Sequence, residues 1–199
     1  MPCSERWPVI IRTAVLVLLL GGSWPACGGW DEARAAERSG DYAKAFAEYR
    51  RLADDGDVQA LHNLGVMYYN GYGVELDYRE ALQCFLEAAE HGVAGSQNNL
   101  GYMYAHGEGV PQDFIRAHMW FDIAAANGES TASENRAILA SRMSAGEIAE
   151  ARRLAREWLK AHPPVTRPVA PPSPKQRPAP AYGVSPVLPA ASRLPPVTA

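Results

Sequence analysis

The chain has little cysteine, and its cysteines form no motif. Among 199 residues the three cysteines are Cys3, Cys27 and Cys84, with no Cys-x-x-Cys spacing. Removal of an N-terminal leader would take Cys3 away, and two remaining cysteines do not make a disulfide framework. The sequence therefore predicts neither a disulfide-stapled fold nor a cysteine-based metal or redox site.

Catalytic and cofactor motifs are also lacking. The histidines have no His-Glu-x-x-His or His-x-His spacing, and no Gly-x-Ser-x-Gly is present. Gly-x-Gly occurs at 71–73 and 107–109, but without the following Gly and Lys of a phosphate-binding loop. The sequence predicts a protein that is not an enzyme, with no metal and no cofactor.

Long hydrophobic runs are limited to one short segment. Ala14–Leu20 reads AVLVLLL and follows Arg6 and Arg12. The run is shorter than the ~20 apolar residues that span a bilayer, and it has the form of a signal peptide. We predict a signal peptide over residues 1–27, cleaved around Ala26–Gly28, and a periplasmic or secreted protein.

Two alternatives concern the same N-terminus. The signal could stay uncleaved and anchor the chain in the membrane. Alternatively, Cys27 could be lipidated, because Ala26-Cys27-Gly28 resembles the end of a lipoprotein signal. Trp24 and Pro25 depart from the residues that such signals prefer. Beyond these two routes we expect no contact with a membrane.

Acidic residues are absent from the C-terminal segment but abundant before it. Residues 31–162 hold 21 acidic and 13 basic residues, whereas residues 163–199 hold four basic residues and no acid. Nucleic-acid binding requires a clustered basic face. The acidic body therefore argues against nucleic acid as the partner.

An internal repeat dominates the middle of the chain. Residues 60–92 read ALHNLGVMYYNGYGVELDYREALQCFLEAAEHG, and residues 96–128 read SQNNLGYMYAHGEGVPQDFIRAHMWFDIAAANG. The two segments align without a gap at an offset of 36. The identical positions include Leu64/Leu100, Gly65/Gly101, Tyr68/Tyr104, Gly71/Gly107, Gly73/Gly109, Val74/Val110, Asp77/Asp113, Ala81/Ala117, Phe85/Phe121, Ala88/Ala124, Ala89/Ala125 and Gly92/Gly128.

Each unit predicts a hairpin of two helices. Apolar and small residues recur at helical spacing on both sides of the Gly-x-Gly loop. Gly65 lies in the first apolar stripe, where it allows close approach of the second helix. Asp77 is a candidate N-cap of that second helix, and Gly92 a candidate glycine after its end. A single hairpin cannot bury its apolar face, so neighbouring hairpins must stack.

These repeated residues resemble the Sel-1-like repeat family, a relative of the tetratricopeptide repeats. The resemblance covers about residues 31–130. Cys84 departs from the pattern, because it occupies the place of Trp120, and we predict that it is a core residue. The family implies an all-α, right-handed solenoid that serves as an adaptor in protein–protein interaction, and its exported bacterial members imply a role in the cell envelope.

Flanking segments complete the predicted solenoid. Thr131-x-x-Glu134 and Ser144-x-x-Glu147 have capping-box spacing, and the helix after Ser144 has one apolar and one charged face, as a terminal element requires. The charged face is either a solvated cap or a contact with a partner. The predicted organisation is a signal peptide over 1–27, an N-terminal half-repeat over 28–56, Sel-1-like repeats over 57–92 and 93–128, a degenerate repeat with a capping helix over 129–162, and a disordered proline-rich tail over 163–199.

Candidate partner-binding residues follow by analogy with the inner groove of tetratricopeptide repeats. These positions flank the core Leu-Gly pair of each first helix and carry amide, imidazole and aromatic groups suited to an extended peptide. The candidates are Gln59, His62, Val66, Tyr69, Asn98 and Tyr102. The alternative is that each is an ordinary solvent-facing position.

The function predicted from these features is a non-catalytic adaptor of the bacterial cell envelope that binds a protein or peptide in the groove. We expect a monomer. One alternative is a structural factor that contacts peptidoglycan or another anionic polymer through the basic proline-rich tail. A further alternative is a regulator of an envelope hydrolase, and the binding groove is the only feature that supports it.

Overall fold

The computed structural model describes residues 28–163. The predicted signal peptide, and the proline-rich tail beyond Pro163, lie outside the described residues. Within the described range the chain forms eight α-helices and no strand. The helices are α1 (Gly28–Ser39), α2 (Tyr42–Asp54), α3 (Val58–Asn70), α4 (Tyr78–Glu90), α5 (Ala94–His106), α6 (Phe114–Ala126), α7 (Ser130–Ala140) and α8 (Ala145–Ala161).

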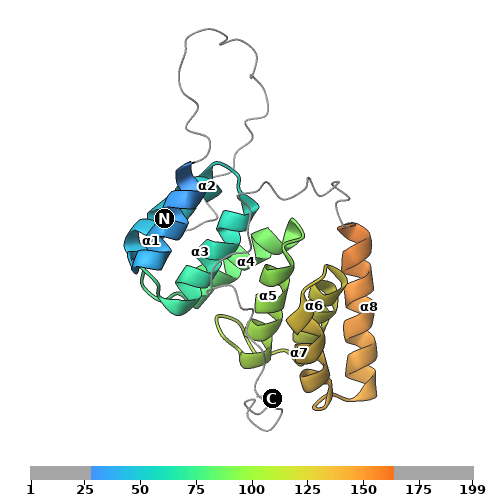
Figure 1. Cartoon of the computed structure of the whole chain (residues 1–199). Coiled ribbons are helices and arrows are strands. Elements are labelled where there is room, and N and C mark those ends of the chain that lie inside the picture. Colours follow the sequence, from blue (N-terminus) through green and yellow to red (C-terminus); the bar gives the residue numbers. More distant parts are fainter. Residues whose placement is uncertain (1–27, 164–199) are drawn as a thin grey trace.

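Successive helices pair as antiparallel hairpins and stack side by side (Figure 1). α5 lies between α4 and α6, and α8 packs against α6 as well as following α7. The predicted all-α solenoid of helical hairpins is confirmed.

Glycine in the first helix of each repeat allows the two helices of a hairpin to touch. A Cβ atom built on Gly65 would lie 2.6 Å from Cε1 of Phe85, and one on Gly101 would lie 2.5 Å from Cε1 of Phe121. Any side chain there would overlap the ring. The predicted packing role of these glycines is confirmed.

The second glycine of each loop joins one hairpin to the one before it. Gly73 has φ +70°, and a Cβ on it would lie 2.2 Å from the carbonyl oxygen of Tyr42, at the start of α2. Gly109 stands in the same relation to Tyr78, at the start of α4, with a distance of 2.8 Å. The loops therefore set the spacing between hairpins as well as closing their own.

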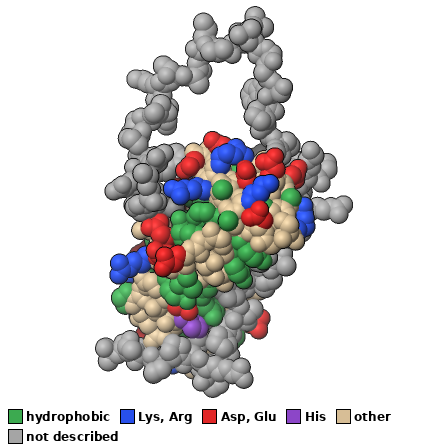
Figure 2. Space-filling model, turned by 90° about the vertical axis from the view of Figure 1, so that its left-hand side faces the viewer, with side chains coloured by type: hydrophobic (Ala, Val, Ile, Leu, Met, Phe, Trp, Pro, Cys, Tyr) green, Lys and Arg blue, Asp and Glu red, His purple; other side chains and the backbone are tan. Residues whose placement is uncertain are grey.

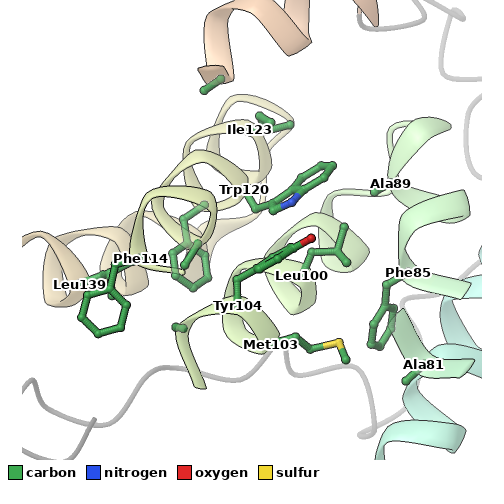
Figure 3. Close-up of a cluster of buried hydrophobic side chains, with 14 residues drawn as sticks. Ala81, Phe85, Ala89, Leu100, Met103, Tyr104, Phe114, Trp120, Ile123 and Leu139 are labelled. Atoms are coloured by element: carbon green, nitrogen blue, oxygen red, sulfur yellow. The ribbon is translucent and has the colours of Figure 1, made fainter. Parts of the chain in front are cut away.

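The core is a continuous series of apolar layers between the hairpins. Phe85, Leu100 and Met103 meet between α4 and α5, and Trp120 continues the layer on α6 (Figure 3). Cys84 is fully buried in the neighbouring cluster, so the prediction of a core role for it is confirmed.

Helix caps follow the sequence closely in the two repeats. The side chain of Asp77 accepts hydrogen bonds from the backbone nitrogens of Arg79 and Glu80, and Asp113 accepts one from Arg116. Gly92 has φ +83° directly after the C-cap of α4. These predicted caps are confirmed.

Outside the repeats the predicted boundaries differ from the structure in two places. Residues 28–56, predicted as a half-repeat, form a complete pair of helices joined at Gly40, which has φ +79°. At α7 the N-cap is Glu129, whose carboxylate accepts a hydrogen bond from the backbone nitrogen of Thr131. The capping box predicted at Thr131 is therefore wrong, because the helix starts just after the turn at Gly128 and already includes Thr131. The capping box at Ser144 and Glu147 is present.

Candidate binding surface

The first helices of the two repeats, α3 and α5, carry no Asp, Glu, Lys or Arg. Their exposed side chains are therefore aromatic, amide, imidazole or aliphatic. The four predicted groove residues that reach the surface are Gln59, which is exposed, and Val66, Tyr69 and Tyr102, which are half-buried. Such a surface suits contact with an extended peptide.

The other two predicted groove residues lie in the interior. His62 is 7% exposed, and its Nδ1 lies 2.8 Å from the hydroxyl oxygen of Ser96 on α5. Asn98 is fully buried, and its side-chain oxygen accepts a hydrogen bond of 3.0 Å from Asn135 on α7. Both side chains link successive hairpins. Because they are buried, neither is placed to contact a peptide bound at the surface.

The reason lies in the helices that surround α5. α5 contacts α4 and α6 closely, and it also touches α3 and α7. The sides of α5 that face these neighbours are covered, and so is the side of α3 that faces α5. The analogy with tetratricopeptide repeats does not extend to these two positions.

A cluster of rings gathers where the loop ends of α3 and α5 meet. The ring centroid of Tyr69 lies 5.3 Å from that of Tyr78 and 6.5 Å from that of Tyr102, in tilted and edge-to-face arrangements. The ring of Tyr102 stacks on His106 with a centroid distance of 4.1 Å. Glu108 completes the cluster, because it accepts a hydrogen bond of 2.5 Å from the hydroxyl of Tyr69. We call these five residues the aromatic surface.

Burial and the neighbouring carboxylate keep Tyr69 protonated. Burial of the hydroxyl raises the pKa of Tyr69 far above its usual value, and the hydrogen bond to the Glu108 carboxylate and its charge raise it further. Burial also raises the pKa of Tyr102. Both rings therefore present neutral faces and hydroxyls over the whole physiological pH range.

Tyr78, His106 and Glu108 were not among the candidates predicted from sequence. Glu108 lies between the two glycines of its loop, and in the first repeat the residue at that place is Tyr72, whose ring stacks on Tyr42 at 5.1 Å. In both repeats the middle residue of the loop thus touches the hairpin before it. The Gly-x-Gly loop recurs at the repeat period, and this recurrence was the sequence signal that could have pointed to its middle residue as a contact between hairpins.

Figure 2 shows one face of the molecule, with hydrophobic side chains gathered in its middle and lower parts and charged side chains mostly in its upper part. Sequence counts agree with an uneven distribution of charge. Residues 58–129 hold nine acidic residues and only two basic ones, Arg79 and Arg116. Both arginines lie in the first turns of α4 and α6, and the guanidinium of Arg116 lies over the ring of Tyr104 on α5, 5.6 Å from its centroid.

One buried charged cluster lies elsewhere and ties α6 to α7. Nδ1 of His118, which is 1% exposed, lies 3.2 Å from a carboxylate oxygen of Asp122, and Arg136 donates to the other oxygen at 2.6 Å. Burial alone would raise the pKa of Asp122, but the hydrogen bonds and charges of His118 and Arg136 outweigh it, and the pKa is lowered. The cluster joins α6 to α7.

The described residues form neither a metal-ligand cluster nor a membrane-spanning helix. Between residues 28 and 163 no three His, Cys, Asp or Glu side chains group as a metal site. None of the helices described combines the length and the apolar character needed to cross a bilayer.

The stacked helical hairpins define the chain as a helical-repeat protein. Residues 58–93 and 94–129 each match the family model described as Sel1 repeat. The chain therefore contains two Sel1 repeats, and such repeats generally act as protein-interaction scaffolds.

Two solved structures are similar. One is a protective antigen present in uropathogenic Escherichia coli strains and displaying an SLR fold; it is 29% identical, with 68% of this chain and 30% of that chain covered and a TM-score of 0.64. The other is a Sel1 repeat protein from Oxalobacter formigenes; it is 30% identical, with 65% of this chain and 55% of that chain covered and a TM-score of 0.47, too low to bear on the fold. This chain therefore spans about a third and about half of their lengths. A comparison with curated proteins finds no match.

Proposed function

We propose that the protein is an exported, non-catalytic adaptor of the bacterial cell envelope that binds an extended segment of a protein partner across α3 and α5. The observation that carries the proposal is the surface of these two helices, which has no charged residue and ends in the aromatic surface. Half-buried tyrosines provide contact area together with a polar hydroxyl, the combination that peptide-binding sites use most.

Export is part of this proposal and rests on the N-terminal sequence. Fractionation of cells, with mass spectrometry of the mature N-terminus, tests it. A chain that starts near Gly28 in the periplasm or medium supports the proposal, and lipidated Cys27 in the membrane fraction supports an anchored form of it. An intact Met1 in the cytosol would contradict export.

Site-specific photocrosslinking tests the binding surface in cells. A photoreactive amino acid is placed at position 66, 69 or 102, and, as matched controls, at the exposed positions 79 and 90 at the two ends of α4. We expect a discrete crosslinked product at the first three positions and none at the controls. Equal crosslinking at all five positions, or at none, would rule out a specific surface on α3 and α5.

The second candidate function, contact with peptidoglycan or another anionic polymer, is favoured by α8. Arg152, Arg156 and Lys160 are exposed at i, i+4 and i+8, and none has an ion-pair partner among residues 28–163. Arg153 differs, because Glu150 and Glu157 both bind it at 2.6 Å. The stripe of three cations leads into the acid-free tail.

Sedimentation with purified peptidoglycan separates the two candidates. If the polymer is the partner, replacing the three cations of the stripe with glutamine lowers the bound fraction, while Tyr102→Ala leaves it unchanged. If the adaptor function is correct, the photocrosslinked product survives the three replacements.

A further inference from the structure

Carboxylates lie within and near the aromatic surface, but none of its five residues is a lysine or arginine. Glu108 lies within it, and at the other end of α3 the charge of Glu129 is close enough to act on His62. α3 and α5 hold no basic residue, and residues 58–129 carry seven more acidic than basic residues. A ligand for this surface therefore gains from positive charge.

The aromatic rings on this surface also favour a particular backbone conformation of the bound segment. Proline-rich segments favour the polyproline II conformation and dock into grooves lined by aromatic residues. Tyr69 provides one such ring, and the ring centroids of Tyr78 and Tyr102 lie within 6.5 Å of its own. An arginine or lysine of the same segment is attracted to a ring face and to the Glu108 carboxylate.

The chain contains a segment with this chemistry. Residues 163–199 include twelve prolines and four basic residues, and no acid. An extended chain of the 36 residues beyond Pro163 spans roughly 110 Å at about 3.1 Å per residue. A folded unit of 136 residues has a radius of gyration of about 14 Å, so the segment is long enough to reach any part of the surface from the end of α8.

We propose that the proline-rich segment 164–199 binds the aromatic surface of its own chain and competes there with the protein partner. This inference rests on the proposed function, because it concerns the same surface. It assigns the partner's chemistry, an extended proline-containing segment with basic residues, and it gives the tail a regulatory role. An anionic polymer that binds the basic tail releases the surface for the partner.

Nuclear magnetic resonance of the full chain tests the intramolecular contact. The backbone amides of Tyr69, Tyr102 and His106 are compared between the natural chain and a variant with Arg167→Gln, Lys175→Gln, Arg177→Gln and Arg193→Gln. We expect shifts confined to the aromatic surface, independent of protein concentration and lost in 0.5 M salt. Glu108→Gln, which can still accept the Tyr69 hydrogen bond, should reduce them, whereas Glu90→Gln at the exposed end of α4 should not.

A synthetic peptide of residues 164–199 provides the second measurement. It is titrated into the full chain and into a chain ending at Pro163, which retains all eight helices and is checked for an unchanged melting temperature. With an effective concentration of ~1 mM for the tethered tail and a peptide dissociation constant of about 0.1 mM, binding to the shortened chain is about tenfold tighter. Tyr102→Ala in the shortened chain should abolish that binding.

Three results would overturn the inference. These are unchanged amide signals in the tail variant, equal affinity of the two chains for the peptide, and shifts that grow with protein concentration, which would mean that the tail binds a second copy. Each leaves the proposed function open to its own test, since an intermolecular crosslinked product at positions 66, 69 and 102 reports on the partner. Absence of that product from the chain ending at Pro163 as well, where no tail competes, would instead contradict the adaptor function.

Discussion

Single polar side chains hold successive hairpins in register. His62 on α3 contacts Ser96 on α5, and Asn98 on α5 contacts Asn135 on α7. All four side chains are buried, where polar groups need hydrogen-bond partners. Loss of one of these buried contacts costs about 1–3 kcal/mol.

The buried His62 predicts that stability falls with acid. Burial lowers its pKa to about 4 from the usual value of 6.5, and the charge of Glu129 opposes the shift only in part. Between pH 6.5 and 4 the unfolded chain therefore binds a proton that the folded chain excludes, and stability decreases as pH falls through this window. The loss approaches about 3 kcal/mol near pH 4. Urea denaturation from pH 7.5 to 4 measures it.

His62→Gln should flatten this pH dependence, because glutamine does not titrate. His91→Gln is the matched control, since His91 is exposed at the end of α4. In His91→Gln, the slope of the free energy of unfolding against pH should stay as in the natural chain. Equal slopes for the natural chain and His62→Gln would show that another group is responsible.

Gly101→Ala should destabilise the second repeat although alanine favours helices. The new Cβ would lie 2.5 Å from the ring of Phe121, which is fully buried and cannot move aside. Overpacking of this kind costs about 1–3 kcal/mol, and the helix propensity of alanine offsets about 1 kcal/mol at most. We expect a net loss of about 1–2 kcal/mol in the free energy of unfolding.

The same substitution at Gly146 is the control. A Cβ there would meet only the hydroxyl oxygen of Ser144, at 4.0 Å. Gly146→Ala should therefore be neutral or slightly stabilising. Phe121→Leu combined with Gly101→Ala should recover part of the loss, and a double variant that is less stable than the sum of the two single changes would argue against the steric explanation.

At the scale of helices, the two repeats begin their second helices in the same way. Asp77 and Asp113 both have extended backbones and accept hydrogen bonds from the first turn of α4 and α6. α5 is different, because its N-cap is Val93, which has no side-chain hydrogen bond. The buried N-terminal turn of α5 is held by packing and by buried polar contacts from Ser96 and Gln97.

Asp77→Ala should cost about 1 kcal/mol, because α4 loses its cap. Asp77→Asn should keep most of the stability, since the amide oxygen still accepts from the backbone nitrogens of Arg79 and Glu80. Thermal denaturation of the two variants gives the comparison. If both lose the same stability, the charge of Asp77 matters and the hydrogen bonds do not.

Helices could be predicted from the sequence where the repeat was visible, and less well elsewhere. The 36-residue offset locates α3 to α6 and their caps, because glycine and aspartate recur at positions that only turns and caps explain. α1 carries no Leu-Gly pair and was therefore missed as a repeat element. His62 and Asn98 were placed on the groove because sequence position gives the side of a helix but not how many neighbours cover it.

At the scale of the whole molecule, the hairpins form a short stack in which α8 covers the last face. Ala151 and Ala155 on α8 are buried, and Trp158 packs edge-to-face on Trp120 with a centroid distance of 5.4 Å. Trp120 itself belongs to the core layer between α4 and α6. The charged residues of α8 lie on the opposite side, as expected of a terminal element.

Removal of α8 should therefore change the behaviour of the entire chain. A chain ending at Met143 leaves the face of α6 around Trp120 open to water, and exposed apolar patches of this kind promote association. We expect concentration-dependent assembly in analytical ultracentrifugation and a lower melting temperature. The chain ending at Pro163 should stay monomeric, because α8 is retained.

The chain ending at Met143 lacks both the packing of α8 on Trp120 and the proline-rich tail. Trp158→Ala in the full chain removes only the packing on Trp120, so it separates the two effects. It removes the ring that shields Trp120 while α8 keeps its capping box at Ser144 and Glu147. Trp120 fluorescence should then shift to longer wavelength and the chain should lose stability, with no change in tail binding. A monomeric chain ending at Met143, with Trp120 still shielded, would mean that the stack closes without α8 and that the helix exists for its basic face.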